Sequence, residues 1–184
     1  MDFTDKQKGV IRGVIPAAIL TIVGLGGVSR LLPVSVLPFD EPGARIAWAL
    51  QWALLPVLTL VVSIARTGNQ RFYSAEDIDG SGLTEGTPQA RVLRAVLQNT
   101  LEQAVLALAA YAIWAVVMPH AWLRSICIAA PFFVTGRVLF ARGYVRGAPG
   151  RALGFAMTAY PTFAMLATAI IVLAFRLLVH SFYL

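Results

Sequence analysis

One acidic residue lies inside a long apolar stretch of this sequence. Glu102 falls within the apolar run of residues 90–118, whereas the other eight Asp and Glu residues lie in polar tails and connections. A carboxylate in such a stretch is costly, so it normally faces the interior of a helix bundle and a polar partner. A regular helix would place four polar side chains within roughly 80° of arc and a fifth roughly 60° further round: Arg91, Arg94, Gln98 and Glu102, followed by Asn99. This polar stripe is either a binding face or a hydrogen-bond network that joins neighbouring helices.

A second concentration of polar residues lies at the end of the next apolar stretch. It comprises four arginines and one tyrosine: Arg137, Arg142, Tyr144, Arg146 and Arg151. Such a cluster can report only the orientation of a membrane chain, which requires charge but no particular spacing. Arg137 does not fit that explanation, because it lies within the apolar run from Phe132 to Phe140. Arg66 ends an earlier apolar stretch, and we expect it on the same side of the membrane.

These residue types are suited to a small anionic ligand. Guanidinium groups bind carboxylates in a bidentate manner and stay charged at physiological pH, while Glu102 complements an ammonium group. The ligand implied is a small zwitterion with more negative than positive groups, and glutathione fits that description. A nearby arginine would also lower the pKa of its thiol and favour the reactive thiolate. No nucleophile from the protein is then needed, and a lipophilic electrophile would arrive from the lipid.

The composition identifies the setting of these residues as a membrane. Of the 184 residues, 58% are hydrophobic and only 13% are charged, and the mean hydropathy is +0.74. A soluble domain carries about a quarter charged residues, so we predict an all-α integral membrane protein. The single cysteine excludes a disulfide scaffold. The net charge of +6 is attributed to membrane orientation and anionic lipid, and we expect neither a nucleic-acid partner nor a metal site.

Five apolar stretches are long enough to cross a bilayer. They cover about residues 10–32, 44–66, 90–118, 121–142 and 151–180. The segment from Thr67 to Pro88 is rich in polar residues and glycine and is expected to be the longest loop. Gly143–Gly150 is expected to form the last connection. We interpret the first stretch as a membrane span, although Lys6, Lys8 and Arg12 precede it as in a signal peptide.

The cations agree with five crossings and a cytoplasmic N-terminus. In that arrangement the cytoplasmic ends would hold eleven cations: Lys6, Lys8, Arg12, Arg66, Arg71, Arg91, Arg94, Arg137, Arg142, Arg146 and Arg151. The opposite ends would hold four: Arg30, Arg45, Arg124 and Arg176. Cytoplasmic connections are enriched in Lys and Arg. The prediction is therefore a multi-pass protein with its C-terminus on the opposite side of the membrane.

Two segments resemble the signatures of a known family. Residues 94–103, RAVLQNTLEQ, resemble the "RAxxN(T)LEQ" helix of the membrane-associated proteins in eicosanoid and glutathione metabolism (MAPEG). Residues 137–151, RVLFARGYVRGAPGR, resemble the second signature, which has an arginine, then "GYxRG", then an arginine entering the last helix. The resemblance covers about residues 44–180. It implies a MAPEG-type four-helix membrane domain at residues 44–184, preceded by a tail and an additional transmembrane helix at 1–43.

The resemblance also implies a homotrimer that binds glutathione as a cosubstrate between subunits, near the cytoplasmic face. By position, Arg151 matches the catalytic arginine that stabilises the thiolate. The residues expected to bind glutathione are Arg66, Arg94, Gln98, Asn99, Glu102, Arg137, Tyr144 and Arg146. The activity implied is that of a glutathione transferase or peroxidase acting on lipophilic electrophiles or lipid hydroperoxides, with membrane lipids as the other partners.

Two departures from the family pattern keep other functions open. Arg94 lies one residue farther from Asn99 than in the family, and Phe140 stands where many catalytic members carry a tyrosine. A noncatalytic MAPEG-fold protein, acting as a lipid-binding or accessory subunit, is the principal alternative. A transporter that uses Glu102 as a proton or substrate site is weaker, because one isolated acid provides no relay.

Overall fold

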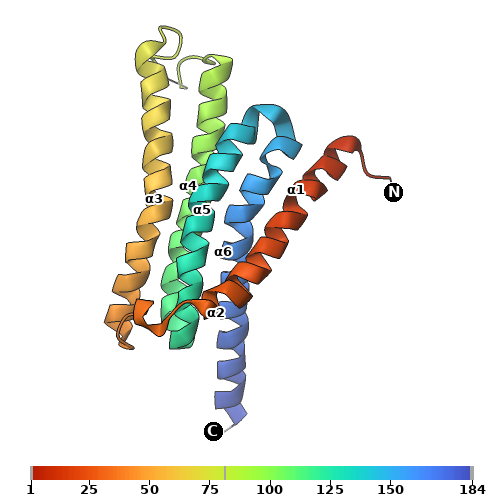
Figure 1. Cartoon of the computed structure of the whole chain (residues 1–184). Helices are drawn as coiled ribbons and strands as arrows, with labels where there is room; N and C mark the ends of the chain where they lie inside the picture. Colours follow the sequence, from red (N-terminus) through yellow and green to blue (C-terminus); the bar gives the residue numbers. More distant parts are fainter. Residues whose placement is uncertain (1, 81, 183–184) are drawn as a thin grey trace.

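The computed structural model describes residues 2–80 and 82–182, with side chains as far as residue 179. Its long elements are all helices (Figure 1): α1 (Asp5–Thr21), α3 (Pro42–Tyr73), α4 (Pro88–Val117), α5 (Arg124–Gly143) and α6 (Gly147–Phe182). The short helical turns are the π-helix η1 (Ile22–Val28), α2 (Ser29–Leu31), η2 (Val34–Val36), η3 (His120–Leu123) and η4 (Tyr144–Arg146). No β-strand occurs in the described residues, and the predicted all-α fold is confirmed.

Four helical segments in the described part of the chain are long and apolar enough to cross a membrane. They are Asp5–Leu31, Pro42–Tyr73, Pro88–Val117 and His120–Val179. The fourth folds back on itself, because α5 and α6 run in opposite directions on either side of η4 (Figure 1). The five apolar stretches of the sequence thus correspond to α1 with its extension, α3, α4, α5 and α6. The chain is an integral membrane protein built as a helical bundle.

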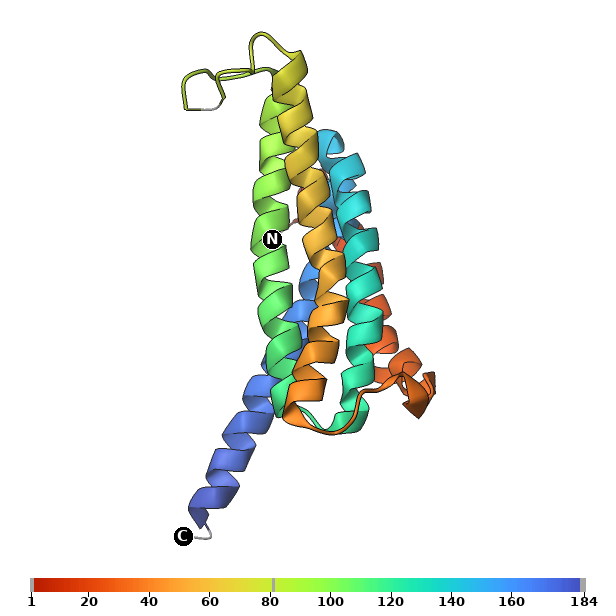
Figure 2. The same ribbon diagram turned by 90° about the vertical axis from the view of Figure 1, so that its left-hand side faces the viewer.

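The two ends of the bundle differ in what they carry. The N-terminus, the α3–α4 loop and the α5–α6 turn lie at one end, and the C-terminus lies at the other (Figure 1). The last turns of α6 project beyond the bundle (Figure 2). Most of the cations counted above therefore gather at the first end, whereas the side of the membrane that each end faces stays a prediction.

The large side chains of the main core lie toward the second end. Tyr111 of α4, Phe133 of α5 and Met165 of α6 are each 1% exposed and belong to one apolar cluster. Alanines of α3 and α4 complete this cluster and let the helices approach closely. The half of the bundle nearer the N-terminus is left for the polar residues of the candidate site.

Small residues bring α5 and α6 into close contact at that half. A methyl group added at Gly136 would lie 2.7 Å from Thr158 Cγ2 and 2.8 Å from the carbonyl oxygen of Gly154. The reversal between the helices depends on Gly147, whose φ of +76° is one that other residues rarely adopt. The hairpin therefore places Arg137 of α5 directly beside α6.

The additional helix α1 packs along α6, which settles a placement that the sequence left open. A methyl group at Gly9 would lie 2.8 Å from Pro149 Cβ, and one at Gly13 would lie 2.9 Å from Ala152 Cβ. This Gly-x-x-x-Gly spacing is typical of close helix contacts in membranes. Glycine at both positions lets α1 approach the first turns of α6.

Two expected connections are shorter than predicted. The loop expected over Thr67–Pro88 was wrong at its start, because α3 continues through Tyr73 and leaves only residues 74–87 between α3 and α4. The polar residues there stay helical, and Thr67 Oγ1 donates to the carbonyl oxygen of Ser63 at 2.9 Å. The connection expected over Gly143–Gly150 is reduced to η4, because α6 already begins at Gly147 and Pro149 is compatible with a first helical turn.

Candidate functional site

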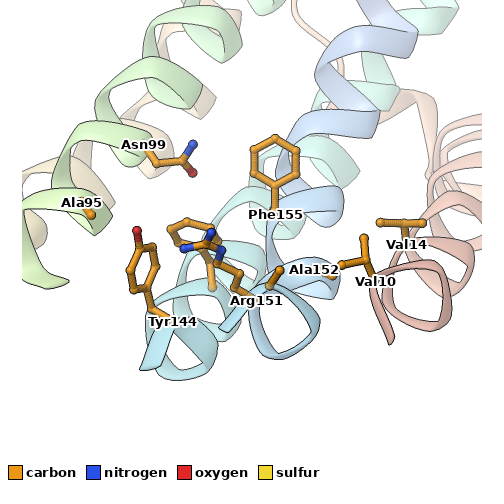
Figure 3. A pocket seen from close by; sticks show the side chains of 10 residues that line it. Val10, Val14, Ala95, Asn99, Tyr144, Arg151, Ala152 and Phe155 are labelled. Carbon is orange, nitrogen blue, oxygen red and sulfur yellow. The ribbon is translucent and has the colours of Figure 1, made fainter. Parts of the chain in front are cut away.

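A cavity of about 330 Å³ opens between α1, α4, α5, η4 and α6 in the half of the bundle nearer the N-terminus (Figure 3). Its volume is at the lower end of the range for small-molecule sites. Most of the wall is apolar, and the polar side chains come from one residue each of α4, η4 and α6. The lining residues are Val10, Val14, Ala95, Asn99, Phe140, Tyr144, Ala148, Arg151, Ala152 and Phe155.

Arg151 is the charged group of this cavity. It lies in the second turn of α6, and its guanidinium carbon is 4.5 Å from the centroid of the Tyr144 ring. This stacking positions the guanidinium group without using its N–H donors. No acidic residue lines the cavity in the described part of the chain. The positive charge therefore faces the cavity without an anionic partner from the same wall.

Tyr144 and Asn99 supply the other polar groups. The Tyr144 side chain points from η4 toward α4, with its hydroxyl on the cavity side (Figure 3). The Asn99 amide oxygen accepts a hydrogen bond from Arg137 Nη1 at 2.8 Å. With its oxygen engaged, the amide can offer its N–H groups to a ligand. The cavity thus presents a cation and two donors, which suits an anionic ligand.

Arg137 is buried behind the cavity and joins three helices. It is 5% exposed, and its Nη2 donates to Thr158 Oγ1 of α6 at 2.6 Å while Nη1 donates to Asn99 of α4. Its guanidinium carbon lies 4.5 Å from the Phe140 ring centroid. Its Nε is buried without a hydrogen-bond partner in the structure. These contacts make Arg137 a positioning residue for Asn99.

Phe140 fills the space that a tyrosine would occupy in the family pattern. It is 4% exposed and packs edge-to-face on Tyr144, with ring centroids 5.5 Å apart. A phenylalanine cannot donate a hydrogen bond. The donors from the aromatic pair at this position are therefore limited to the Tyr144 hydroxyl.

Four predicted site residues are exposed and lie outside the cavity in the single chain. Gln98 and Glu102 are exposed on α4, and Gln98 Nε2 donates to Glu102 Oε1 at 3.0 Å. Arg66 is exposed on α3. Arg146 is also exposed, on η4, and does not line the cavity. The fold therefore brings together Asn99, Arg137, Tyr144 and Arg151, and leaves the other predicted residues on outer surfaces.

Arg94 lies in the second turn of α4 and binds to the loop between α3 and α4. Its Nη2 donates to the carbonyl oxygen of Glu85 at 2.9 Å, and the adjacent Ala95 lines the cavity instead. The loop is organised by the buried Asp77, which accepts hydrogen bonds from Gln70 Nε2 and from the backbone N–H of Thr87. These hydrogen bonds hold the pKa of Asp77 well below its ordinary value. Arg94 thus helps to fix the start of α4, which carries Asn99.

Sequence reasoning missed the residues that complete the site. Thr158 lies seven positions after Arg151 on α6, and Phe155 lies four positions after it, so all three share one helix face. Val10 and Val14 show the same spacing on α1. Helical periodicity could have grouped these residues within each helix, but the choice of face required the packing partner.

Comparison with known proteins gives one match. The family model described as "MAPEG family" matches residues 46–171, which run from the second turn of α3 into the second half of α6. Helix α1 lies before the matched region. Comparison with curated proteins and with solved structures finds no match.

Proposed function

Because this chain belongs to the MAPEG family, we propose that it is a glutathione-dependent transferase or peroxidase of the membrane. Membership itself makes the chain a membrane protein of eicosanoid and glutathione metabolism. The proposal adds that glutathione binds as a cosubstrate in the cavity at Arg151. The thiolate then reacts with a lipophilic electrophile or a lipid hydroperoxide.

The observation that carries this proposal is the position of Arg151. Its guanidinium group lines a mostly apolar cavity and stacks on Tyr144. A fixed cation beside a thiol favours the ionised form, because it stabilises the developing negative charge. Tyr144 and the Asn99 amide supply hydrogen bonds to the bound peptide. Arg137 acts through Asn99 by holding its amide oxygen.

The apolar part of the cavity suits the second substrate. Phe140 and Phe155 line one side, and Val10 and Val14 of α1 line another. In the transfer reaction the thiolate sulfur forms a bond to the electrophilic carbon, and the leaving group departs or the accepting double bond takes a proton. In the peroxidase reaction the thiolate sulfur bonds to the terminal peroxide oxygen, the O–O bond breaks, and the alkoxide takes a proton and leaves as the alcohol. A second glutathione thiol then reacts with the resulting glutathione sulfenic acid, which gives glutathione disulfide and water. No nucleophile from the chain takes part in either route.

A homotrimer is part of the same proposal. Glu102 and Gln98 are exposed on α4 among apolar residues such as Leu101 and Val105. A carboxylate facing lipid is costly, and a second copy of the chain against this face would cover it. Assembly would also bring Glu102 near an ammonium group of a ligand bound at the interface. The mass of the detergent-solubilised complex, determined by light scattering, tests this part.

Turnover assays test the proposed activity directly. Purified protein in detergent should conjugate glutathione to a lipophilic aryl halide or reduce a lipid hydroperoxide. Replacing Arg151 with Gln should lower the rate on the order of a hundredfold, and Arg151→Lys should retain part of it. Arg12→Gln is the matched control, because Arg12 is an exposed arginine of α1 that does not line the cavity. Equal rates for wild type and Arg151→Gln would refute the proposal.

Phe140 favours one other function. A buried phenylalanine in place of a tyrosine leaves fewer donors in the cavity, as in a site that binds without turnover. In that case the chain is a lipid-binding or accessory subunit of the same fold. Binding of a lipophilic ligand without any glutathione turnover, in wild type and in Phe140→Tyr, would support this alternative.

A further inference from the structure

A second cavity lies at the end of the bundle opposite the first. Its volume is about 440 Å³, and it opens between η1, α2, α4, η3, α5 and α6. The floor is apolar, with Leu25, Trp114, Ala164 and Met165 among its residues. The rim is cationic, because Arg30 of α2 and Arg124 of α5 both line it. In the part of the chain that the structure describes, no acidic residue lines this cavity.

The two arginines keep donors available for a ligand. The Arg30 guanidinium carbon lies 5.8 Å from the Trp122 ring centroid. Among the described residues the Arg30 side chain has no hydrogen bond or ion pair, although its backbone carbonyl oxygen accepts from Arg124 Nη1 at 3.4 Å. Arg124 donates through Nε to the carbonyl oxygen of Ala121 at 3.0 Å and through Nη1 to that of Leu32 at 2.7 Å. Its Nη2 has no hydrogen-bond partner among the described residues. Two guanidinium groups thus meet at the rim without an anionic partner.

The hydroxyl groups near the cavity are already engaged. Ser29 Oγ donates to the carbonyl oxygen of Leu25 at 2.6 Å, and Ser125 Oγ lies 3.5 Å from the same oxygen. That oxygen lies within η1, whose π-helical geometry widens the turn, a feature frequent at functional sites. Positive charge and apolar surface, rather than hydroxyl groups, are therefore what the cavity offers a ligand.

The placement of these arginines is not explained by membrane orientation. Most cations of the chain gather at the other end, and the end that holds Arg30 and Arg124 needs few. Trp114 and Trp122 line the cavity at this end, and tryptophan is enriched at the level of the lipid headgroups. The guanidinium groups therefore lie where lipid phosphates are found, above an apolar space that can take an acyl chain.

We propose that this second cavity binds one anionic phospholipid. Its phosphate would lie between Arg30 and Arg124, and an acyl chain would lie along Leu25 and Met165. A lipid with a cationic headgroup is disfavoured, because no carboxylate lines the cavity and the Trp122 ring is already covered by Arg30. The site depends on η1 and α2, which precede the matched region of the family model. The proposal is independent of the activity at Arg151.

Tryptophan quenching by brominated lipids tests the proposal. The background is Trp48→Phe/Trp52→Phe, which leaves the two tryptophans that line the cavity, Trp114 and Trp122. The protein is placed in vesicles in which an equal fraction of either phosphatidylglycerol or phosphatidylcholine carries bromine. We expect stronger quenching by brominated phosphatidylglycerol. Arg30→Gln should reduce this preference about fivefold.

A pair of glycines provides a matched steric control. Gly26 lines the cavity and Gly27 does not, and a methyl group at either would meet no atom within 4 Å. Gly26→Leu should therefore fill the cavity and abolish the preference, whereas Gly27→Leu should retain it. Arg176→Gln, an exposed arginine on α6 outside the cavity, should also retain it.

Three results would overturn the assignment. They are equal quenching by both brominated lipids in the background protein, an unchanged preference in Gly26→Leu, and loss of preference in Gly27→Leu as well. The quenching measurement is repeated with inorganic phosphate and with chloride at the same ionic strength. A change of tryptophan fluorescence with phosphate, together with equal quenching by the two brominated lipids, would assign the arginines to a free anion and refute the lipid site. Persistence of the preference would support the lipid.

Discussion

The hydrogen bond between Arg137 and Thr158 makes a quantitative prediction about the buried centre of the bundle. Thr158 Oγ1 accepts from Arg137 Nη2 at 2.6 Å and donates to the carbonyl oxygen of Phe155 at 2.8 Å. The substitution Thr158→Val keeps the shape of the side chain but removes both bonds. A buried charged donor then loses one of its two hydrogen-bond acceptors, which costs about 1.5–3 kcal/mol. We expect the free energy of unfolding to fall by that amount.

The same substitution should cost much less when the charge is absent. Arg137→Met removes the guanidinium group, including its buried Nε that has no partner, and substitutes an apolar chain. Replacing both partners of a buried pair by apolar groups is nearly neutral. Thr158→Val in the Arg137→Met background should therefore change the free energy of unfolding by only about 0.5 kcal/mol.

Denaturant titration in detergent, followed by circular dichroism, measures all four members of this cycle. The predicted interaction energy between the two positions is about 1–2.5 kcal/mol, in the range for residues that share a network. An equal cost of Thr158→Val in both backgrounds would refute the reasoning, since it would show that the hydroxyl does not serve Arg137.

Two further predictions concern the parts that hold the site in place. Gly13→Leu should destabilise the protein by about 1–3 kcal/mol, because its Cβ would lie 2.9 Å from Ala152 Cβ; thermal melting should show it, with Gly27→Leu as the neutral control. Asp77 has a pKa below its ordinary value in the folded protein. Its contribution to the free energy of unfolding is therefore complete above about pH 4, the pKa of an ordinary Asp, and is lost as the pH falls toward the lower pKa of the folded state. The melting temperature of the wild type should fall as the pH is lowered below about 4, and that of Asp77→Asn should fall much less. Equal falls in the two proteins would contradict this prediction.

The positions of the membrane helices could be predicted from apolar stretches alone. The structure confirms the all-α bundle and the additional N-terminal helix. The end of α3 was missed because residues 67–71 are polar or glycine, a composition that indicates a loop in a membrane protein. The helix continues through these residues, and Gln70 Nε2 of its last turns donates to Asp77 of the following loop at 3.0 Å, a contact that depends on how the loop folds back.

The partner of α1 could not be predicted. A helix in lipid is apolar on all sides, so periodicity does not select its contact face. The Gly9–Gly13 pair indicates a close helix contact, and in the structure these glycines face Pro149 and Ala152 of α6. This packing also brings Val10 and Val14 to the cavity at Arg151.

The candidate site could be predicted in part. Signature positions identified Asn99, Tyr144 and Arg151, which line one cavity, although their roles stay predictions. Thr158 was missed because its importance arises from tertiary contact with Arg137 on the neighbouring helix. Glu102 was predicted as a site residue because a carboxylate is costly inside a membrane. It lies outside the cavity of the single chain, so it would reach a bound ligand only if a second copy of the chain packs against α4.

Titration of glutathione into the detergent-purified protein tests the central claim most directly. Heat of binding and the ultraviolet absorbance of the thiolate are followed together in wild type, Arg151→Gln, Glu102→Gln and the control Arg12→Gln. We predict binding with thiolate formation in wild type and Arg12→Gln, loss of the thiolate signal in Arg151→Gln, and weaker binding in Glu102→Gln. Absence of binding at millimolar glutathione, or an unchanged thiolate signal in Arg151→Gln, would contradict the proposed function.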